Sequence, residues 1–135
     1  MNDLLICKFV RNQVPRLLAA SGQLVSVEII LGDEKRRLAL LQKLAEEVYE
    51  FQHARTRTSE IEEVGDMIEI LCAIDRYYPN LEGRLIPWAR EVIARHVAHP
   101  IHARLIEEAR IKKLNLKGGF DWFLRATYRQ QIISG

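Results

Sequence analysis

Cysteine is scarce in this chain, and its scarcity excludes two classes of small protein. Cys7 and Cys72 are the only two, and each lies in an apolar stretch. Two isolated cysteines provide neither a disulfide framework nor the paired spacing of a zinc site. We therefore expect reduced, buried thiols, as is usual for proteins of the cytoplasm.

Long hydrophobic runs and an excess of one charge are also missing. No apolar stretch approaches the roughly 20 residues that a membrane-spanning helix needs. The first residues, with Asp3 among them, lack the pattern of a cleaved signal peptide, so we expect a cytoplasmic protein without a membrane partner. Lys and Arg number 20 against 18 Asp and Glu, and because the two signs are interspersed, we expect no nucleic-acid partner.

The chain shows helical periodicity over most of its length. Its 135 residues predict one domain, residues 1–135, which is long enough to bury a core. Residues 33–55 contain no Gly or Pro, and a second helix is expected from the Ser59–Glu62 capping box to about Tyr78. Pro100 separates two further helices, expected at about 81–99 and 101–114.

Strands are predicted only as minor additions. Residues 24–31 are rich in β-branched residues and give the clearest strand signal, while 4–7 and 121–128 allow either a strand or a packed arm. A short helix is expected at 15–20, and the tail from residue 129 is expected to be loose. The short connection between the two long helices should make them antiparallel neighbours. The predicted fold class is therefore all-α, an antiparallel helical bundle with minor short strands.

Two acidic clusters recur on the two long helices. Glu47 and Glu50 are three residues apart, as are Glu63 and Asp66, so each pair shares one helix face. Four converging carboxylates would need cations because like charges repel, and oxygen-only sites favour hard divalent ions such as Mg²⁺. Helical projection places Glu63 inside an apolar arc, where a free carboxylate is costly. The plain alternative is a solvated acidic helix surface.

The apolar stripe expected on the first long helix helps to place Glu47. Projection puts this carboxylate at the edge of the stripe, with Lys43 one turn earlier between Glu47 and Glu50. The stripe is expected to contain Leu38, Leu41, Leu44, Ala45, Val48 and Phe51.

Three motifs occur in a fixed order along the chain. Glu47-x-x-Glu50 is followed, after 12 residues, by Glu63-x-x-Asp66. Lys8-Phe-Val-Arg-Asn-Gln-Val-Pro15 opens the chain, and Lys117-Gly-Gly-Phe120 follows the last helix. Together they resemble the MazG-related all-α NTP pyrophosphatase superfamily, in particular its small phosphoribosyl-ATP pyrophosphohydrolase-like members. Asn12 and Gln13 depart from the acid and the base of the usual opening motif, and residues 79–106 look longer than the usual connection.

The resemblance implies a fold of the all-α NTP pyrophosphatase type and a homo-oligomer, either a dimer or a tetramer. It also implies Mg²⁺-dependent hydrolysis of a nucleoside triphosphate to monophosphate and pyrophosphate, with Mn²⁺ as a substitute ion. The metal ligands would be Glu47, Glu50, Glu63 and Asp66, and the catalytic carboxylates would be Glu46 and Glu47. Phosphate-binding groups would be Lys8, Arg11, Lys43, Lys113, Lys117 and the backbone of Gly118 and Gly119.

Other functions stay open at this point. One is a phosphoribosyl-ATP pyrophosphohydrolase, and another is a non-catalytic helical module that binds a partner. A zinc site at His96, His99 and His102 is disfavoured because Pro100 interrupts the helical spacing. The two tryptophans, Trp88 and Trp122, could stack on a base, although packing is the favoured interpretation.

Overall fold

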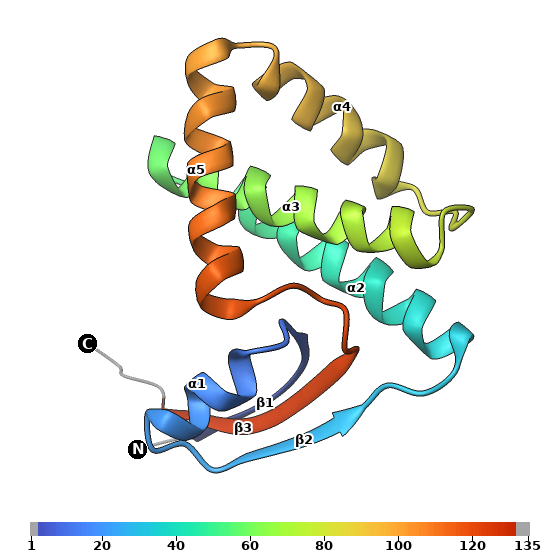
Figure 1. The fold of residues 1–135 in the computed structure, drawn as a ribbon, viewed down its shortest axis with the longest axis vertical. Coiled ribbons are helices and arrows are strands. Elements are labelled where there is room, and N and C mark those ends of the chain that lie inside the picture. Colours follow the sequence, from blue (N-terminus) through green and yellow to red (C-terminus); the bar gives the residue numbers. More distant parts are fainter. Residues whose placement is uncertain (1–2, 132–135) are drawn as a thin grey trace.

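A computed structural model describes residues 3–131, and these residues form five helices and three strands (Figure 1). Helices α2 to α5 pack together, and the sheet with α1 forms the other end of the molecule. The predicted helical bundle is confirmed in this coarse form. In chain order the elements are β1 (Asp3–Val10), α1 (Val14–Ala20), β2 (Val25–Ile29), α2 (Asp33–Gln52), α3 (Arg57–Tyr77), α4 (Leu85–Val97), α5 (Pro100–Lys117) and β3 (Leu124–Gln131).

The segments predicted as minor strands form one small sheet. Its order is β1-β3-β2, with antiparallel pairing throughout, so β3 lies in the centre and joins the two ends of the chain. Lys8 pairs with Ala126, which pairs with Val27. Because β3 runs to Gln131, residues 129–131 are not a loose tail, and 132–135 lie outside the described residues. Local sequence could not reveal this pairing, which joins segments more than a hundred residues apart.

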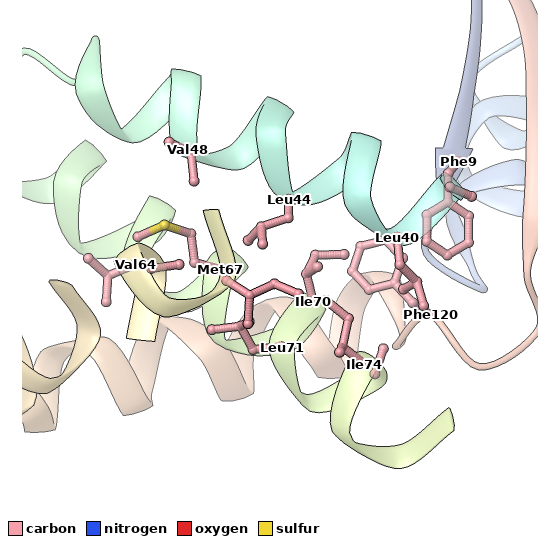
Figure 2. Close-up of a cluster of buried hydrophobic side chains, with 14 of the residues drawn as sticks. Phe9, Leu40, Leu44, Val48, Val64, Met67, Ile70, Leu71, Ile74 and Phe120 are labelled. Atoms are coloured by element: carbon pink, nitrogen blue, oxygen red, sulfur yellow. The ribbon is translucent and has the colours of Figure 1, made fainter. Parts of the chain in front are cut away.

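The core lies mainly between α2 and α3. Figure 2 shows Leu40, Leu44 and Val48 of α2 above Val64, Met67 and Ile70 of α3. Tyr78, just after α3, donates a hydrogen bond of 2.8 Å to Asp33 in the first turn of α2, so the predicted antiparallel arrangement is confirmed. Each fully buried aliphatic side chain contributes roughly 1.5–3 kcal/mol to folding. This core fixes the rotation of both helices about their axes.

The buried face of α2 differs from the predicted stripe. Leu38 is 54% exposed and Ala45 is also exposed, whereas Leu40, Lys43 and Glu47 are buried. The helix turns Leu40 toward the aromatic residues at the sheet end of the core, and this rotation carries Lys43 and Glu47 inward. Glu47 is therefore inside the buried face, not at its edge.

Two smaller sequence predictions also need correction. Thr56, not Ser59, caps α3: its side chain accepts the Ser59 N–H at 3.0 Å, so the helix begins at Arg57. Both cysteines, Cys7 and Cys72, are free but exposed. Within residues 3–131, no helix is both long and apolar enough to cross a membrane.

Helix α5 is held against α3 and against the end of β1. Arg110 donates to Glu69 of α3 at 2.6 Å, where the Glu69 carboxylate is largely buried. Beyond α5, the N–H of Asn12 donates to the carbonyl of Gly119 and that of Gln13 to Lys117, both at 2.8 Å. These contacts bring the end of β1 to the end of α5, where two predicted basic motifs meet.

An apolar segment stays exposed on the sheet. Residues 24–31 include Leu24, Val27, Ile29 and Leu31, all exposed, and Leu24 is 93% accessible. They lie on or beside β2, which is an edge strand of the described sheet. The apolar faces of α2 and α3, by contrast, are covered by the other helices and by the sheet.

Candidate functional site

The predicted charged residues line a single cavity. It has a volume of about 310 Å³ and lies where α2, α3 and α5 meet the end of β1. The structure thus brings together motifs that are distant in sequence. The lining residues are Lys8, Val10, Arg11, Val14, Leu18, Lys43, Glu46, Glu47, Glu50, Glu63, Asp66, Lys113, Lys117, Phe120 and Tyr128.

Three of the four predicted metal ligands converge on one side of this cavity. Glu47, Glu50 and Glu63 each offer a carboxylate oxygen, and these oxygens all lie within 4.8 Å of one another. We call them the three-carboxylate group. Glu47 is buried, Glu63 is half-buried and Glu50 is exposed. Among the described residues, Oε2 of Glu47 and Oε2 of Glu63 are buried side-chain oxygens without a hydrogen-bond partner.

Burial makes the charged form of two of these carboxyls costly. Burial, and then the negative charge of Asp66, raises the pKa of Glu47 to about 9. Burial also raises the pKa of Glu63 to about 7, with Asp66 and Glu50 adding to the shift. A cation bound beside such a carboxyl favours its deprotonated form, so the cation would offset the cost of burying that charge.

Lys43 is buried on the same face of α2. Its Nζ lies 3.2 Å from Oε1 of Glu46 and 3.7 Å from Oε1 of Glu47. Lys43 therefore offsets part of the acidic charge, in addition to lining the cavity where we predicted it to bind phosphate. Glu46 is half-exposed and stays accessible from the cavity.

Asp66 lies in the cavity but outside the three-carboxylate group. Its Oδ1 accepts hydrogen bonds from Arg11 at 2.9 Å and Lys113 at 2.8 Å, and its Oδ2 accepts one from Lys113 at 2.6 Å. The Asp66 residue is only 7% exposed. The spacing of Glu63 and Asp66 predicted a shared metal site, whereas the structure gives Asp66 two basic partners.

Four basic residues gather around Asp66, and we call Lys8, Arg11, Lys113 and Lys117 the cation cluster. Arg11 is buried, donates to the carbonyl of Gly118 at 3.1 Å, and stacks over the Phe120 ring at 5.0 Å. Burial, followed by the positive charge of Lys113, lowers the pKa of Lys117. The cluster therefore carries more positive charge than Asp66 alone offsets.

The two motif glycines act differently from the prediction. The N–H of Gly118 donates to Leu114 at 2.9 Å, so it ends α5 and is not free for phosphate, and neither Gly118 nor Gly119 lines the cavity. Gly118 has a φ of +79°, and an added Cβ would approach the Cβ of Asn12 to 3.2 Å. Glycine is needed here for the close turn that brings α5 to β1.

The departure at Asn12 from the usual acid has a structural account. The side-chain oxygen of Asn12 accepts the backbone N–H of Trp122 at 3.0 Å. A neutral amide oxygen can accept this bond as a carboxylate would. The departure at Gln13 similarly leaves its backbone bond to Lys117 intact.

A second cavity was not predicted from the sequence. It has a volume of about 490 Å³ and runs between α3 and α5; we call it the α3–α5 groove. Asp66, Lys113 and Lys117 line both cavities, and Tyr128 of β3 is a further unpredicted residue of the first. Finding either from sequence would require knowing how α5 crosses α3. The groove is lined by Arg57, Thr58, Ile61, Glu62, Asp66, Leu105, Glu108, Ala109, Arg110, Lys112, Lys113, Leu116 and Lys117.

The histidines His96, His99 and His102 lie outside both cavities. His96 bonds to Glu60 at 2.8 Å, and the His99 and His102 rings lie 4.8 Å apart between centroids. Within residues 3–131, the acids, histidines and cysteines close enough to share an ion are those of the three-carboxylate group. Trp88 packs near Phe51, with ring centroids 6.2 Å apart, and does not line either cavity.

Comparison with known proteins adds no further constraint. No family model, no curated protein and no solved structure matches the chain. The resemblance carried by the three motifs therefore stays a prediction, and function is argued below from the residues of the two cavities.

The raised pKa values predict how pH changes stability when divalent cations are chelated. The folded state holds the Glu47 proton more tightly than the unfolded state, so the stability contributed by this proton is lost as pH rises from about 4.5 toward about 9. We expect Glu47→Gln to have a higher Tm than wild type at pH 8 in EDTA, and a flatter dependence of Tm on pH. Thermal unfolding between pH 5 and 9, followed by circular dichroism, measures both. Parallel pH profiles of the two proteins would contradict the assignment of this titration to Glu47.

Proposed function

We propose that the protein is a Mg²⁺-dependent nucleotide pyrophosphohydrolase, which cleaves a nucleoside triphosphate to a nucleoside monophosphate and pyrophosphate. The observation that carries the proposal is that one cavity combines the three-carboxylate group with the cation cluster. Carboxylate oxygens suit a hard divalent cation, and the N–H donors of Arg and Lys suit phosphate oxygens. A metal–polyphosphate complex is the kind of substrate that uses both.

The residues fit the ion that the motif resemblance implies. The donors are all oxygens, and the unpartnered oxygens of Glu47 and Glu63 are buried where an uncompensated charge is costly. Glu47, Glu50 and Glu63 would hold Mg²⁺, and Mn²⁺ could replace it because it also accepts carboxylate ligands. When bound, the ion supplies positive charge that offsets the carboxylates and the triphosphate.

The protein's own groups account for the remaining chemistry. A water oxygen attacks the α-phosphorus, the bond from this phosphorus to the bridging oxygen breaks, and pyrophosphate leaves with the bonding electrons. Glu46 accepts the proton of the attacking water, because it is an accessible carboxylate that Lys43 holds beside the three-carboxylate group. Arg11, Lys113 and Lys117 offset the charge that develops on the leaving pyrophosphate.

The α3–α5 groove supports a nucleotide rather than an inorganic polyphosphate as substrate. The cavity that contains the three-carboxylate group and the cation cluster is called the catalytic cavity below. The groove adjoins it at Asp66, Lys113 and Lys117, so a phosphate chain bound by the cation cluster would leave its nucleoside in the groove. Its volume of about 490 Å³ is within the usual range for small-molecule sites. Aliphatic residues, including Ile61, Leu105 and Ala109, form part of its lining.

Two alternatives differ from this proposal in what they release. A phosphoribosyl-ATP pyrophosphohydrolase would break the same kind of bond but accept only phosphoribosyl-ATP. A non-catalytic binding module would release no pyrophosphate from any nucleotide. Whether the substrate is a standard nucleotide or a non-standard one that the cell removes depends on the base, which a substrate panel identifies.

The proposal predicts pyrophosphate release that depends on Glu63. We expect the wild-type protein with Mg²⁺ to release pyrophosphate from at least one member of a nucleotide panel that includes phosphoribosyl-ATP. Glu63→Gln should lower both Mg²⁺ affinity and kcat by about a hundredfold or more, since it removes a ligand oxygen's charge. Glu91→Gln, an exposed change of the same charge on α4, is the matched control and should have little effect. Release of orthophosphate, or no loss in Glu63→Gln, would contradict the proposal.

The groove predicts a variant that separates nucleotide binding from polyphosphate binding. Ala109→Phe fills the α3–α5 groove, so we expect the KM for the nucleotide to rise at least about tenfold. Binding of inorganic triphosphate, measured by calorimetry, should be unchanged because its phosphates lie in the other cavity. Ile111→Phe, on an exposed part of the same helix outside the groove, is the control. Equal effects of both variants on the KM would rule out the groove as the nucleoside site.

Self-association is part of the same proposal, because the motif resemblance also implies a homo-oligomer. The apolar faces of α2 and α3 are covered within the chain, so the exposed apolar segment 24–31 is the surface that supports self-association. Exposed apolar edge strands tend to pair with another chain. We expect light scattering after size exclusion to give a dimer or tetramer at micromolar concentration, and Leu24→Lys with Ile29→Lys to give a monomer. A monomeric wild-type protein would contradict this prediction.

A further inference from the structure

Asp66 lines the catalytic cavity together with the two halves of the site, the three-carboxylate group and the cation cluster. It accepts three hydrogen bonds from Arg11 and Lys113, at 2.6 to 2.9 Å. It is also close enough to the three-carboxylate group for its charge to act on Glu47 and Glu63. Its carboxylate therefore interacts with both halves, although it is bonded to only one.

Its two possible partners compete for the same oxygens. A carboxylate has about four acceptor positions, and the Arg11 and Lys113 bonds already use three. A divalent cation beside Lys113 and Arg11 would also be repelled by them. Asp66 thus cannot serve fully as a metal ligand while it keeps both basic partners.

Arg11 and Lys113, the basic partners of Asp66, also belong to the cation cluster, which would bind the phosphates in the proposed function. Arg11 is buried, and Lys113 has an ammonium that lines both cavities. A buried charge that loses its partner is strongly destabilised. Arg11 and Lys113 would therefore break their bonds to Asp66 only when phosphate oxygens take the place of its carboxylate. In the same way, Asp66 would give up these two partners only when another cation takes their place.

We propose that Asp66 exchanges partners: it holds Arg11 and Lys113 in the empty protein, and it turns to the divalent cation when phosphate takes over these two residues. Asp66 is thus a positioning residue before substrate arrives and a metal ligand afterwards. This inference rests on the proposed function and deepens it. By thermodynamic linkage, phosphate then raises the affinity for the cation, and the cation raises the affinity for phosphate to the same extent.

A double-mutant cycle on Mg²⁺ affinity tests the exchange in nucleotide-free protein. Lys113→Met frees Asp66, so we expect it to raise Mg²⁺ affinity about tenfold by calorimetry, a size usual for directly coupled residues. Lys117→Met removes the same charge from the same cavity without breaking an Asp66 bond, so its gain should be much smaller. Asp66→Asn alone should lower this affinity less than it does when phosphate is present, and the gain from Lys113→Met should vanish in the Asp66→Asn background.

A second measurement uses inorganic phosphate as the probe. Millimolar phosphate should raise the Mg²⁺ affinity of wild type but not that of Asp66→Asn. Equal gains from Lys113→Met and Lys117→Met would show a general charge effect and overturn the exchange, as would an Asp66→Asn protein whose Mg²⁺ affinity phosphate raises as much as it raises that of wild type. Circular dichroism checks folding of each variant, and Lys113→Gln replaces Lys113→Met if the latter unfolds.

The two proposals fail in different ways. If Glu63→Gln binds Mg²⁺ as well as wild type does, the metal site itself is wrong and the proposed function falls with it. If Glu63→Gln loses Mg²⁺ while Lys113 and Asp66 show no coupling, only the exchange is overturned.

Discussion

The buried ion pairs of Asp66 are the interaction on which the arrangement of the site depends. Arg11 follows β1, Asp66 belongs to α3 and Lys113 to α5, so two ion pairs join three elements that are distant in sequence. Removing one partner would leave a buried charge uncompensated, which typically costs several kcal/mol. The backbone bonds from Asn12 and Gln13 to the end of α5 reinforce the same junction. The cavity exists because this junction holds α5 across α3.

The second constraint is the free-energy cost of holding the three carboxylates close together, which lowers the stability of the folded protein. Glu47 and Glu63 are held where the charged form is unfavourable, with Lys43 offsetting only part of the charge. Proteins keep such groups where function needs them, and stability is then supplied elsewhere. Here the core between α2 and α3 supplies it, since Leu44, Val48 and Val64 are buried between these two helices.

The sequence predicted the helices and the set of charged residues better than their arrangement. Apolar periodicity together with proline and glycine signals located all five helices because these signals are local, but periodicity misplaced the buried face of α2, which depends on where Phe9 and Phe120 pack. The pairing of β1 with β3 could not be predicted from the sequence, because strand register depends on a partner strand far along the chain. The three-residue spacing also assigned Asp66 and Glu63 to one metal site. Only the position of Lys113 on α5 shows why the Asp66 carboxylate bonds to a basic residue and does not join that of Glu63.

The unequal burial of the three carboxylates further indicates how the site combines rigidity with adaptability. Glu47 follows Leu44 and precedes Val48 on a helix face that packs in the core, so it cannot swing away without uncovering apolar side chains. Glu50 lies one turn later and is exposed, so its carboxylate can move at little cost. For the ion proposed above, a site with one fixed and one mobile ligand would be preformed and would still adjust as phosphate enters. Because a preformed group loses less conformational entropy on binding, the fixed carboxylate would then contribute more to the affinity for that ion than the mobile one.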